Sequence, residues 1–444
     1  MMARTMRMLD VVEDTEYLEM QHPDKELVAQ ACFKGGGAGI NEVLKELKRS
    51  DARTALFAAT PFQPLLRMGD VKGEGMICHI IYQSFRTLPL YLHNLKKSND
   101  DTWTNVKLDV NGHFEACFVS LGCLLYAFLS CTLPVVFVGS ARLRENRVGT
   151  MFTAVPVDGN RQPLPVAYGF GVRENVRTWT WWLTMLKDCM RGAREVAFIS
   201  NVSNCMNSAL HNVFPNSYHG YCCENMSMIL KSRCRPNATQ LAFFWHASVL
   251  AKQARWLDNI ARDKWAMAYF PCIRFNVMVA TIPDALSLLL FDEQNVPIEC
   301  LIDAVRHTLQ VCVNERSRAV IVGPLTPFTE RVYRRRLSKA ERCEVRHLGN
   351  STFEVSDYDQ NFILDYSTKD CSCGKWRKSG IQCRHAIATA HKNNIDVSHS
   401  MCDILYYVDA FRCTYHSGVI NPTPPPADWE MPDNWMVVLP PLEH

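Results

Sequence analysis

The amino-acid sequence predicts a mixed α/β protein with a small metal-binding module in its C-terminal part. Between residues 134 and 223, short apolar runs rich in β-branched residues alternate with amphipathic helical stretches. Further on, two Cys one residue apart are followed, nine residues later, by a Cys and a His one residue apart. Four such side chains can close a tetrahedral shell around Zn²⁺.

Composition sets the limits within which these elements fold. A chain of 444 residues has room for two or three domains with hydrophobic cores. A hydrophobic content of 48% with 21% charged residues excludes a disordered chain. The net charge of +3 is too small to indicate a nucleic-acid partner by itself. The 19 Cys lack a disulfide-like spacing, which predicts a reducing compartment, cytosol or nucleus.

Two segments bear on targeting and membranes. The first 20 residues have no apolar stretch after their Arg residues, so no signal peptide is expected. Residues 116–141 carry no charge and are long enough to span a bilayer. Pro134, however, divides them into a helix-like part, 115–131, and a strand-like run, 135–138. We therefore expect a core helix followed by a core strand, and no membrane span.

The remaining elements follow in order along the chain. Residues 1–80 show no clear organisation, and a helix that ends in a polar turn is expected from residue 84. The turn Asp158-Gly159-Asn160 predicts a hairpin within 149–172. The helix after it places Trp179, Trp181 and Trp182 at core spacing. Further elements are expected as a helix at 173–190, a strand at 195–200, a helix at 204–214 and a strand at 217–223.

The spacing of residues within the metal motif predicts its local structure. A one-residue gap between ligands suits a strand or sharp turn, where residues i and i+2 share a face. Gly374 and Gly380 allow a tight return, and the run after the second pair predicts a helix. The result is a small ββα module around structural Zn²⁺. His391 is a possible substitute ligand, but the spacing favours the His of the C-x-H pair. The expected ligands are Cys371, Cys373, Cys383 and His385.

The signature C-x-C-x(n)-C-x-H resembles the SWIM zinc finger, which is typical of the C-terminal part of Mutator-like (MULE) transposases and of proteins derived from them. The segment VDGNRQPLPVAYGFGVRENVRTWTWWL is similar to the family's D-G-N…P-x-A…E-x-x-x-x-W-x-W-F-L. FPNSYHGYCCENM is similar to its F-P-x-x-x-H-x-x-C-x-x-H-L. The resemblance covers residues 80–430 in order. It implies an α/β fold with an RNase H-like transposase core, a helical insertion and a small ββα SWIM module.

The resemblance also divides the chain. It implies a poorly defined N-terminal region (1–80), the transposase-like core with its insertion (81–310), a basic linker helix with strands (311–365), the SWIM finger (366–400), and a C-terminal helix with a Pro-rich tail (401–444). Family members usually carry an N-terminal DNA-binding zinc domain. Residues 1–80 hold only Cys32 and Cys78, so recognition of specific element ends is in doubt.

Such transposases hold divalent metal ions with two or three carboxylates, because Mg²⁺ prefers hard oxygen ligands. At the family's acid positions this chain has Gly139, Asn201 and, on the late helix, Asp284, while Asn225 stands at a family His. One acid cannot hold two Mg²⁺. The resemblance therefore implies a degenerate core with no catalytic residues.

Other polar residues are alternative candidates for metal ligands or for a Cys/His catalytic pair. Asp158 or Glu174 would be metal ligands if the alignment were shifted, but turn chemistry explains the first and the helix dipole the second. His219 and Cys223 would share a strand face as a Cys/His pair, together with Cys222. We expect these residues to be structural, since isolated Cys are usually buried small hydrophobes.

The segment 331–346 carries seven Lys or Arg against two Glu. A basic helix beside a zinc finger can contact phosphates, and the alternative is an ordinary solvated helix face. Arg384 lies between two ligands and is expected to point away from the metal. In the Pro-rich tail, Trp429 and Trp435 are candidate docking aromatics. The candidate contacts to the DNA backbone are Arg334, Arg335, Arg336, Lys339 and Arg384.

The sequence thus predicts a zinc-binding, transposase-derived protein that binds DNA or protein partners in the nucleus, like the plant regulators derived from the same transposases. An active or residual Mutator-like DNA transposase is the alternative enzyme function. A decaying element copy without a selected function is a third interpretation.

Overall fold

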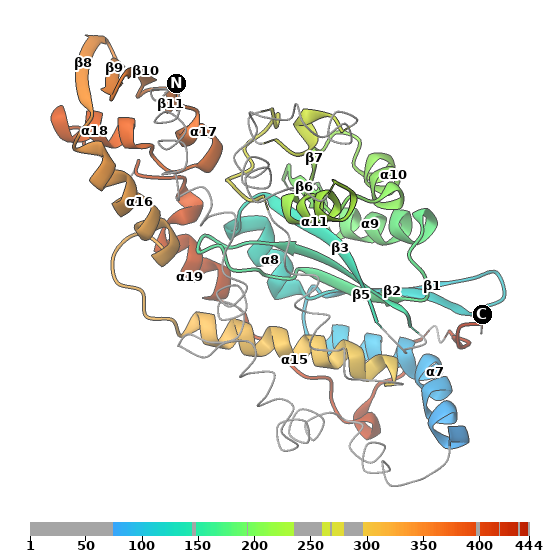
Figure 1. Cartoon of the computed structure of the whole chain (residues 1–444). Coiled ribbons are helices and arrows are strands. Elements are labelled where there is room, and N and C mark those ends of the chain that lie inside the picture. The colour runs from blue at the N-terminus through green and yellow to red at the C-terminus, as the bar shows by residue number, and fades with distance from the viewer. Residues whose placement is uncertain are drawn as a thin grey trace.

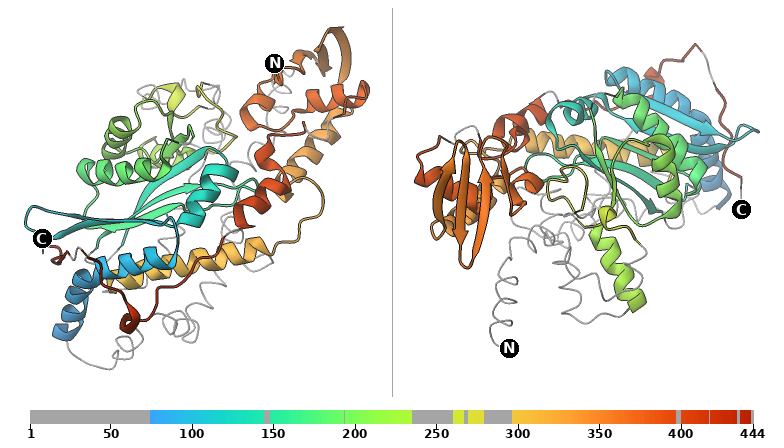
Figure 2. Two further views of the ribbon diagram at one scale, coloured as in Figure 1. Left: turned by 180° about the vertical axis from the view of Figure 1, so that it is seen from behind. Right: turned by 90° about the horizontal axis from the view of Figure 1, so that it is seen from above.

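A computed structural model describes residues 74–143, 148–192, 194–234, 260–266, 269–278, 296–396, 400–416, 418–433 and 436–442 (Figure 1). Asp284, Trp435, Cys32 and most of the expected N-terminal region and helical insertion lie outside these residues. A large sheet with helices on both faces forms the core. A smaller unit with its own sheet projects from one end of it (Figure 2).

The core sheet has seven strands in the order β1-β2-β5-β4-β3-β6-β7. β3 pairs with β6, and β6 with β7, in parallel, and the other neighbours are antiparallel. The predicted hairpin and the strands around residues 135 and 197 are confirmed. The strands are β1 (Trp103–Leu108), β2 (Phe114–Ser120), β3 (Val135–Arg142), β4 (Thr150–Pro156), β5 (Ala167–Gly171), β6 (Ala197–Ser200) and β7 (His219–Tyr221).

Alternating side chains on the strands supply two hydrophobic cores. In β3, Val135 and Phe137 face one core and Val136 and Val138 the other, because successive strand residues point to opposite faces. The helices α9 (Val176–Met190) and α10 (Asn204–Val213) cover the second face, whereas α7 (Glu74–Ser98) and α15 (Ile298–Ser317) cover the first (Figure 1).

The Trp cluster lies in the core, as predicted. Trp179 and Trp182 are fully buried in α9, and the Trp179 ring meets Phe152 of β4 edge to face, with 4.7 Å between ring centroids. Trp181 is partly buried at the margin of the same core. These rings are therefore packing residues and not a platform for stacking bases.

The prediction of one helix over residues 115–131 is wrong in its first half. Residues 114–120 form β2, and helix α8 (Gly122–Cys131) follows. The apolar run becomes a strand because it pairs with β1 on one side and β5 on the other. The turn between β1 and β2 carries a signal that the sequence analysis missed. The Asp109 carboxylate accepts from the Asn111 and His113 amides at 2.8 Å each, and Gly112 has a positive φ of 86°.

The expected strand at 217–223 is shorter than predicted. β7 ends at Tyr221, and Cys223 begins helix α11 (Cys223–Cys234). His219 and Cys223 therefore do not share a strand face, so the alternative of a Cys/His pair on that strand is wrong. His219 Nε2 instead lies 2.8 Å from Ser200 Oγ on the neighbouring strand β6.

Among the residues that the structure describes, no helix combines the length and apolar character that a membrane crossing requires.

The smaller unit is a second sheet flanked by helices. Its order is β11-β10-β9-β8, all antiparallel, with α18 against one face and α16 beside α18. The strands expected within 311–365 are confirmed as β8 and β9, whereas β10 was missed. One sheet thus joins residues on both sides of the expected boundary at 365. The elements of this unit are α16 (Pro327–Ala340), β8 (Glu344–Gly349), β9 (Thr352–Asp357), β10 (Gln360–Asp365), β11 (Asp370–Cys371), α17 (Lys375–Ser379) and α18 (Arg384–Lys392). Helix α19 (Val408–His416) follows and packs against α8 and α15 of the core. Short 3₁₀ turns lie at Arg262–Lys264, beside β7, and at Ile404–Tyr406 and Pro426–Asp428.

The β4–β5 turn joins the two units. The buried Asp158 carboxylate accepts from two turn amides at 2.8 Å each and from Tyr415 Oη of α19 at 2.7 Å. Thr326 Oγ1 donates to Gly159 O at 2.8 Å. A Cβ added to Gly159 would lie 2.0 Å from Leu405 O, so the close approach requires glycine. Asp158 is thus a turn residue, as predicted, and also the anchor of the C-terminal helix.

The C-terminal tail returns along the core. Trp429 packs against Tyr91 of α7, with 6.0 Å between ring centroids, and its Nε1 donates to Pro424 O at 2.7 Å. Leu439 pairs with His113 beside the β1–β2 turn. The expected docking aromatic Trp429 therefore docks within its own chain.

Candidate metal centre

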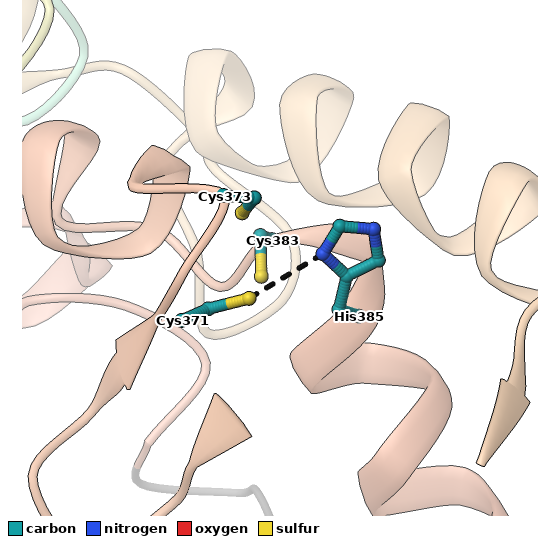
Figure 3. A group of neighbouring side chains, drawn as sticks. All are labelled: Cys371, Cys373, Cys383 and His385. Carbon is teal, nitrogen blue, oxygen red and sulfur yellow. Dashed lines mark hydrogen bonds between the residues drawn. The ribbon is translucent and has the colours of Figure 1, made fainter. Parts of the chain in front are cut away.

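All four predicted zinc ligands come together in the smaller unit (Figure 3). Cys371 ends β11, Cys373 follows it, Cys383 precedes α18, and His385 lies in the first turn of that helix. Their ligating atoms lie within 4.8 Å of one another, and only Cys373 is partly exposed. The two ligand pairs, which are separated in the sequence, thus form one compact cluster in the fold.

The two glycines provide the return that the sequence predicted. Gly374 and Gly380 have positive φ values of 67° and 73°, at the two ends of the short helix α17. The Gly374 amide donates to Cys371 O at 2.7 Å, which closes a tight turn between the first two ligands. The chain then reverses direction at Gly380, which places Cys383 and His385 beside Cys371 and Cys373.

His385 is oriented from both of its ring nitrogens. Nδ1 lies 3.4 Å from Cys371 Sγ (Figure 3), and Nε2 lies 3.3 Å from Asp357 Oδ2. Phe362 stacks on the imidazole, with 4.1 Å between ring centroids. The alternative ligand His391 is exposed near the end of α18 and is not part of the cluster. His385 therefore presents Nδ1 to the three sulfurs.

The thiols are close enough to share protons. A hydrogen bond from Cys371, followed in size by one from Cys383, lowers the pKa of the Cys373 thiol. The same contact with Cys373 raises the pKa of Cys371. Thiolate is the form of cysteine that binds metal.

This donor set fits Zn²⁺. Three soft sulfurs and one imidazole nitrogen suit Zn²⁺ and exclude Mg²⁺ or Ca²⁺, which prefer oxygen. Four protein ligands fill a tetrahedral shell and leave no position for a reacting water. The centre is therefore a structural zinc site. It holds the ββα module together and has no hydrolytic role.

The candidate phosphate contacts separate into two groups. Arg334 and Arg335 of α16 are exposed, and Lys339 is half-buried. The prediction for Arg336 is corrected. It is 3% exposed, and its Nη1 donates to Ile381 O at 2.7 Å and to Gln382 O at 3.0 Å. It thereby fastens α16 to the loop before Cys383.

Arg384 is also corrected as a candidate phosphate contact. Its side chain is 24% exposed, and Nε lies 2.5 Å from Asp357 Oδ2. It points away from the sulfur cluster, as predicted, but toward a carboxylate of the protein. Asp357 itself was missed by the sequence analysis, because a single acid at the end of a strand carries no metal-site signal.

The family's catalytic positions also meet in the core. Val138 pairs with Ser200 across the parallel strands β3 and β6, so Gly139 and Asn201 follow side by side at the carboxyl edge. Asn225 Oδ1 accepts from the Val202 amide at 3.0 Å at the same edge. None of these three positions has a carboxylate.

The two alternative acids have structural partners. Glu174 accepts from Trp179 Nε1 at 3.0 Å, just before the Asn175 N-cap of α9. Asp158 follows β4 at the opposite edge of the sheet, since Pro156 pairs with Val136 near the start of β3. In the described part of the chain, groups of three or more possible metal ligands occur at the zinc cluster and at Cys343, Asp357 and His385, which shares its histidine.

Comparisons with known proteins agree with this two-part organisation. Residues 143–228 match the MULE transposase domain, and this segment contains Asn201 and Asn225. Residues 361–394 match the SWIM zinc finger, and this segment contains all four zinc ligands. No curated protein matches the chain. The chain therefore carries a MULE transposase domain and a C-terminal SWIM zinc finger, the combination that its sequence motifs predicted.

Proposed function

We propose that this protein binds duplex DNA in the nucleus through the basic face of α16 beside its zinc finger, and that it does not cut the DNA. One observation carries the proposal. Arg331, Arg334 and Arg335 are exposed together on α16, while Arg336 of the same helix ties it to the zinc finger. The basic face is thus presented by a helix that the zinc module holds in place.

The spacing supports a single contact surface. Residues three and four apart share one side of a helix, so Arg331 lies beside both Arg334 and Arg335. Arg334 is 76% exposed even though it pairs with Glu330 at 2.5 Å. An exposed pair of this kind contributes little to stability, so the guanidinium can exchange its partner for a phosphate. Contacts of this type bind the DNA backbone without reading sequence.

The core supports the proposal that the protein does not cut DNA. Strands β3, β4 and β5 are consecutive and antiparallel, and β6 and β7 add in parallel next to β3, which is the order that an RNase H-like core requires. At its carboxyl edge, Gly139, Asn201 and Asn225 offer no carboxylate that could hold a catalytic metal ion. A metal-dependent cut needs several converging acids.

Reversing the charge of Arg331, Arg334 and Arg335 to Glu is expected to weaken binding to duplex DNA more than tenfold at low salt. The dependence of log K on log salt should also become shallower by about three, since each phosphate contact contributes roughly one unit. Fluorescence anisotropy with a labelled duplex at several salt concentrations measures both quantities.

A matched control separates a local face from net charge. Arg177, Lys231 and Arg412 are exposed on α9, α11 and α19, and reversing them changes the net charge by the same amount. We expect this control to retain most of the affinity. Equal losses in the two triple variants would contradict a binding face on α16.

The alternative function is that of an active transposase, which the family core suggests. Purified protein with Mg²⁺ or Mn²⁺ is expected neither to nick a supercoiled plasmid nor to join element-end DNA, as read on agarose and sequencing gels. Metal-dependent cleavage that disappears on Asp284→Ala would establish the transposase function and overturn the proposal.

A further inference from the structure

A second layer of side chains surrounds the zinc-ligating histidine. Asp357, the last residue of β9, is buried, and its Oδ2 lies 3.3 Å from His385 Nε2. We propose that Asp357 is a positioning residue of the zinc finger, which selects the His385 tautomer that presents Nδ1 to the metal. The proposal rests on the zinc site and is independent of DNA binding.

The position of the imidazole proton decides which ring nitrogen can bind a metal ion. A neutral histidine carries one ring proton, so one nitrogen donates and the other has a free lone pair. A carboxylate can only accept, and beside Nε2 it stabilises the tautomer with the proton there. Nδ1, 3.4 Å from Cys371 Sγ, then has its lone pair directed into the sulfur cluster. Carboxylates in this position fix the ring and make the ligand more basic.

Two arginines hold Asp357 in turn. Arg384 Nε lies 2.5 Å from Oδ2, and Arg342 Nε lies 3.2 Å from Oδ1. Arg384 Nε also approaches His385 Nε2 as a donor, at 3.5 Å. Asp357 Oδ2 is nearer, at 2.5 Å, and it is charged, so the carboxylate attracts this hydrogen more strongly than the ring nitrogen does. A buried carboxylate without cations would be costly, and these two ion pairs offset that cost.

The charges of the two layers balance. Three thiolates around Zn²⁺ leave one negative charge, and Asp357 adds another within the same buried region. Arg384 and Arg342 supply two positive charges and so neutralise the assembly. Arg342 closes the layer on the outside, with its guanidinium 4.1 Å above the Tyr358 ring. Arg384, which lies between two zinc ligands in the sequence, thus contributes to the zinc site itself.

A second metal ion is the competing explanation for this cluster. Atoms of Cys343, Asp357 and His385 lie within 4.8 Å of one another. However, guanidinium groups already contact both Asp357 oxygens, and two positive charges there disfavour a further cation. His385 would also have to give up its proton to bind two metals. The contacts therefore favour an outer layer around one zinc ion.

The test compares Asp357→Asn with Asp359→Asn in the full-length zinc-loaded protein. Asp359 is exposed in the following turn, so the control makes the same chemical change two residues away. Competition with a chromophoric chelator is expected to show zinc binding about 10–100-fold weaker in the first variant. The control should bind zinc as the wild type does.

NMR of histidine labelled with ¹⁵N gives an independent readout. In the wild type, His385 is expected to have metal-bound Nδ1 and protonated Nε2. Unchanged zinc affinity in Asp357→Asn, or a wild-type His385 bound through Nε2, would overturn the proposal. So would two zinc ions per wild-type chain, one of them lost in the variant. If the Asp357→Asn variant does not fold, the proposal is tested by the His385 tautomer that NMR finds in the wild type. A wild type without zinc would contradict the zinc site itself.

Discussion

Replacing Cys383 by Ser is expected to remove zinc and to unfold the zinc finger. Cys383 is fully buried, and it links the loop after α17 to the start of α18. A structural Zn²⁺ contributes about 10–16 kcal/mol of apparent binding free energy to finger-sized folds. That contribution exceeds the stability of a small module of this kind. Zinc per chain by mass spectrometry and hydrogen exchange over residues 344–396 measure the two effects.

Cys413→Ser is the matched control. Cys413 is an exposed cysteine of α19 outside the zinc cluster. It should retain one zinc per chain and slow exchange in β9, β10 and α18. The zinc assignment would be refuted by a Cys383→Ser variant with normal zinc content and normal exchange, or by a wild type with well under one zinc per chain.

Arg336→Ala is expected to destabilise the protein by about 2–4 kcal/mol, because two buried carbonyl groups lose a charged donor. The loop that carries these carbonyls leads directly into Cys383, so zinc affinity should fall as well. Chemical denaturation of the zinc-loaded protein measures the free energy of unfolding, and chelator competition measures zinc affinity.

The adjacent arginine provides the contrast. Arg335→Ala changes an exposed residue of the same helix, and its effect on stability should stay within about 0.5 kcal/mol. It should instead weaken DNA binding, since Arg335 belongs to the basic face. If both variants lost the same stability, the two arginines would not have the separate roles that the structure gives them.

Local patterns predicted the zinc finger well because its ligands and glycines lie within fifteen residues of one another. Spacing alone determined which side chains could meet, and Gly374 and Gly380 marked the turns between them. The β2 segment was harder. An uncharged run fits a helix or a strand equally well. The choice depends on pairing with β1, which the sequence analysis did not predict, and with β5, which is distant in the sequence.

The error at Arg336 has a signal that could have been used. Val332, Arg336 and Ala340 are spaced four apart and form the buried stripe of α16. Arg336 therefore occupies a core position within a basic run. No comparable signal exists for Asp357, because its contact with His385 joins residues 28 apart and depends on how α18 packs against the sheet.

The measurement that tests the central claim most directly is a salt titration of duplex DNA binding by the zinc-loaded, full-length protein with Mg²⁺ present. Binding through the three exposed arginines of α16 predicts that log K falls linearly with log salt, with a slope of about −3 or steeper. The DNA should remain uncut throughout. Absence of binding at low salt would contradict the account and would favour a protein partner for the zinc finger.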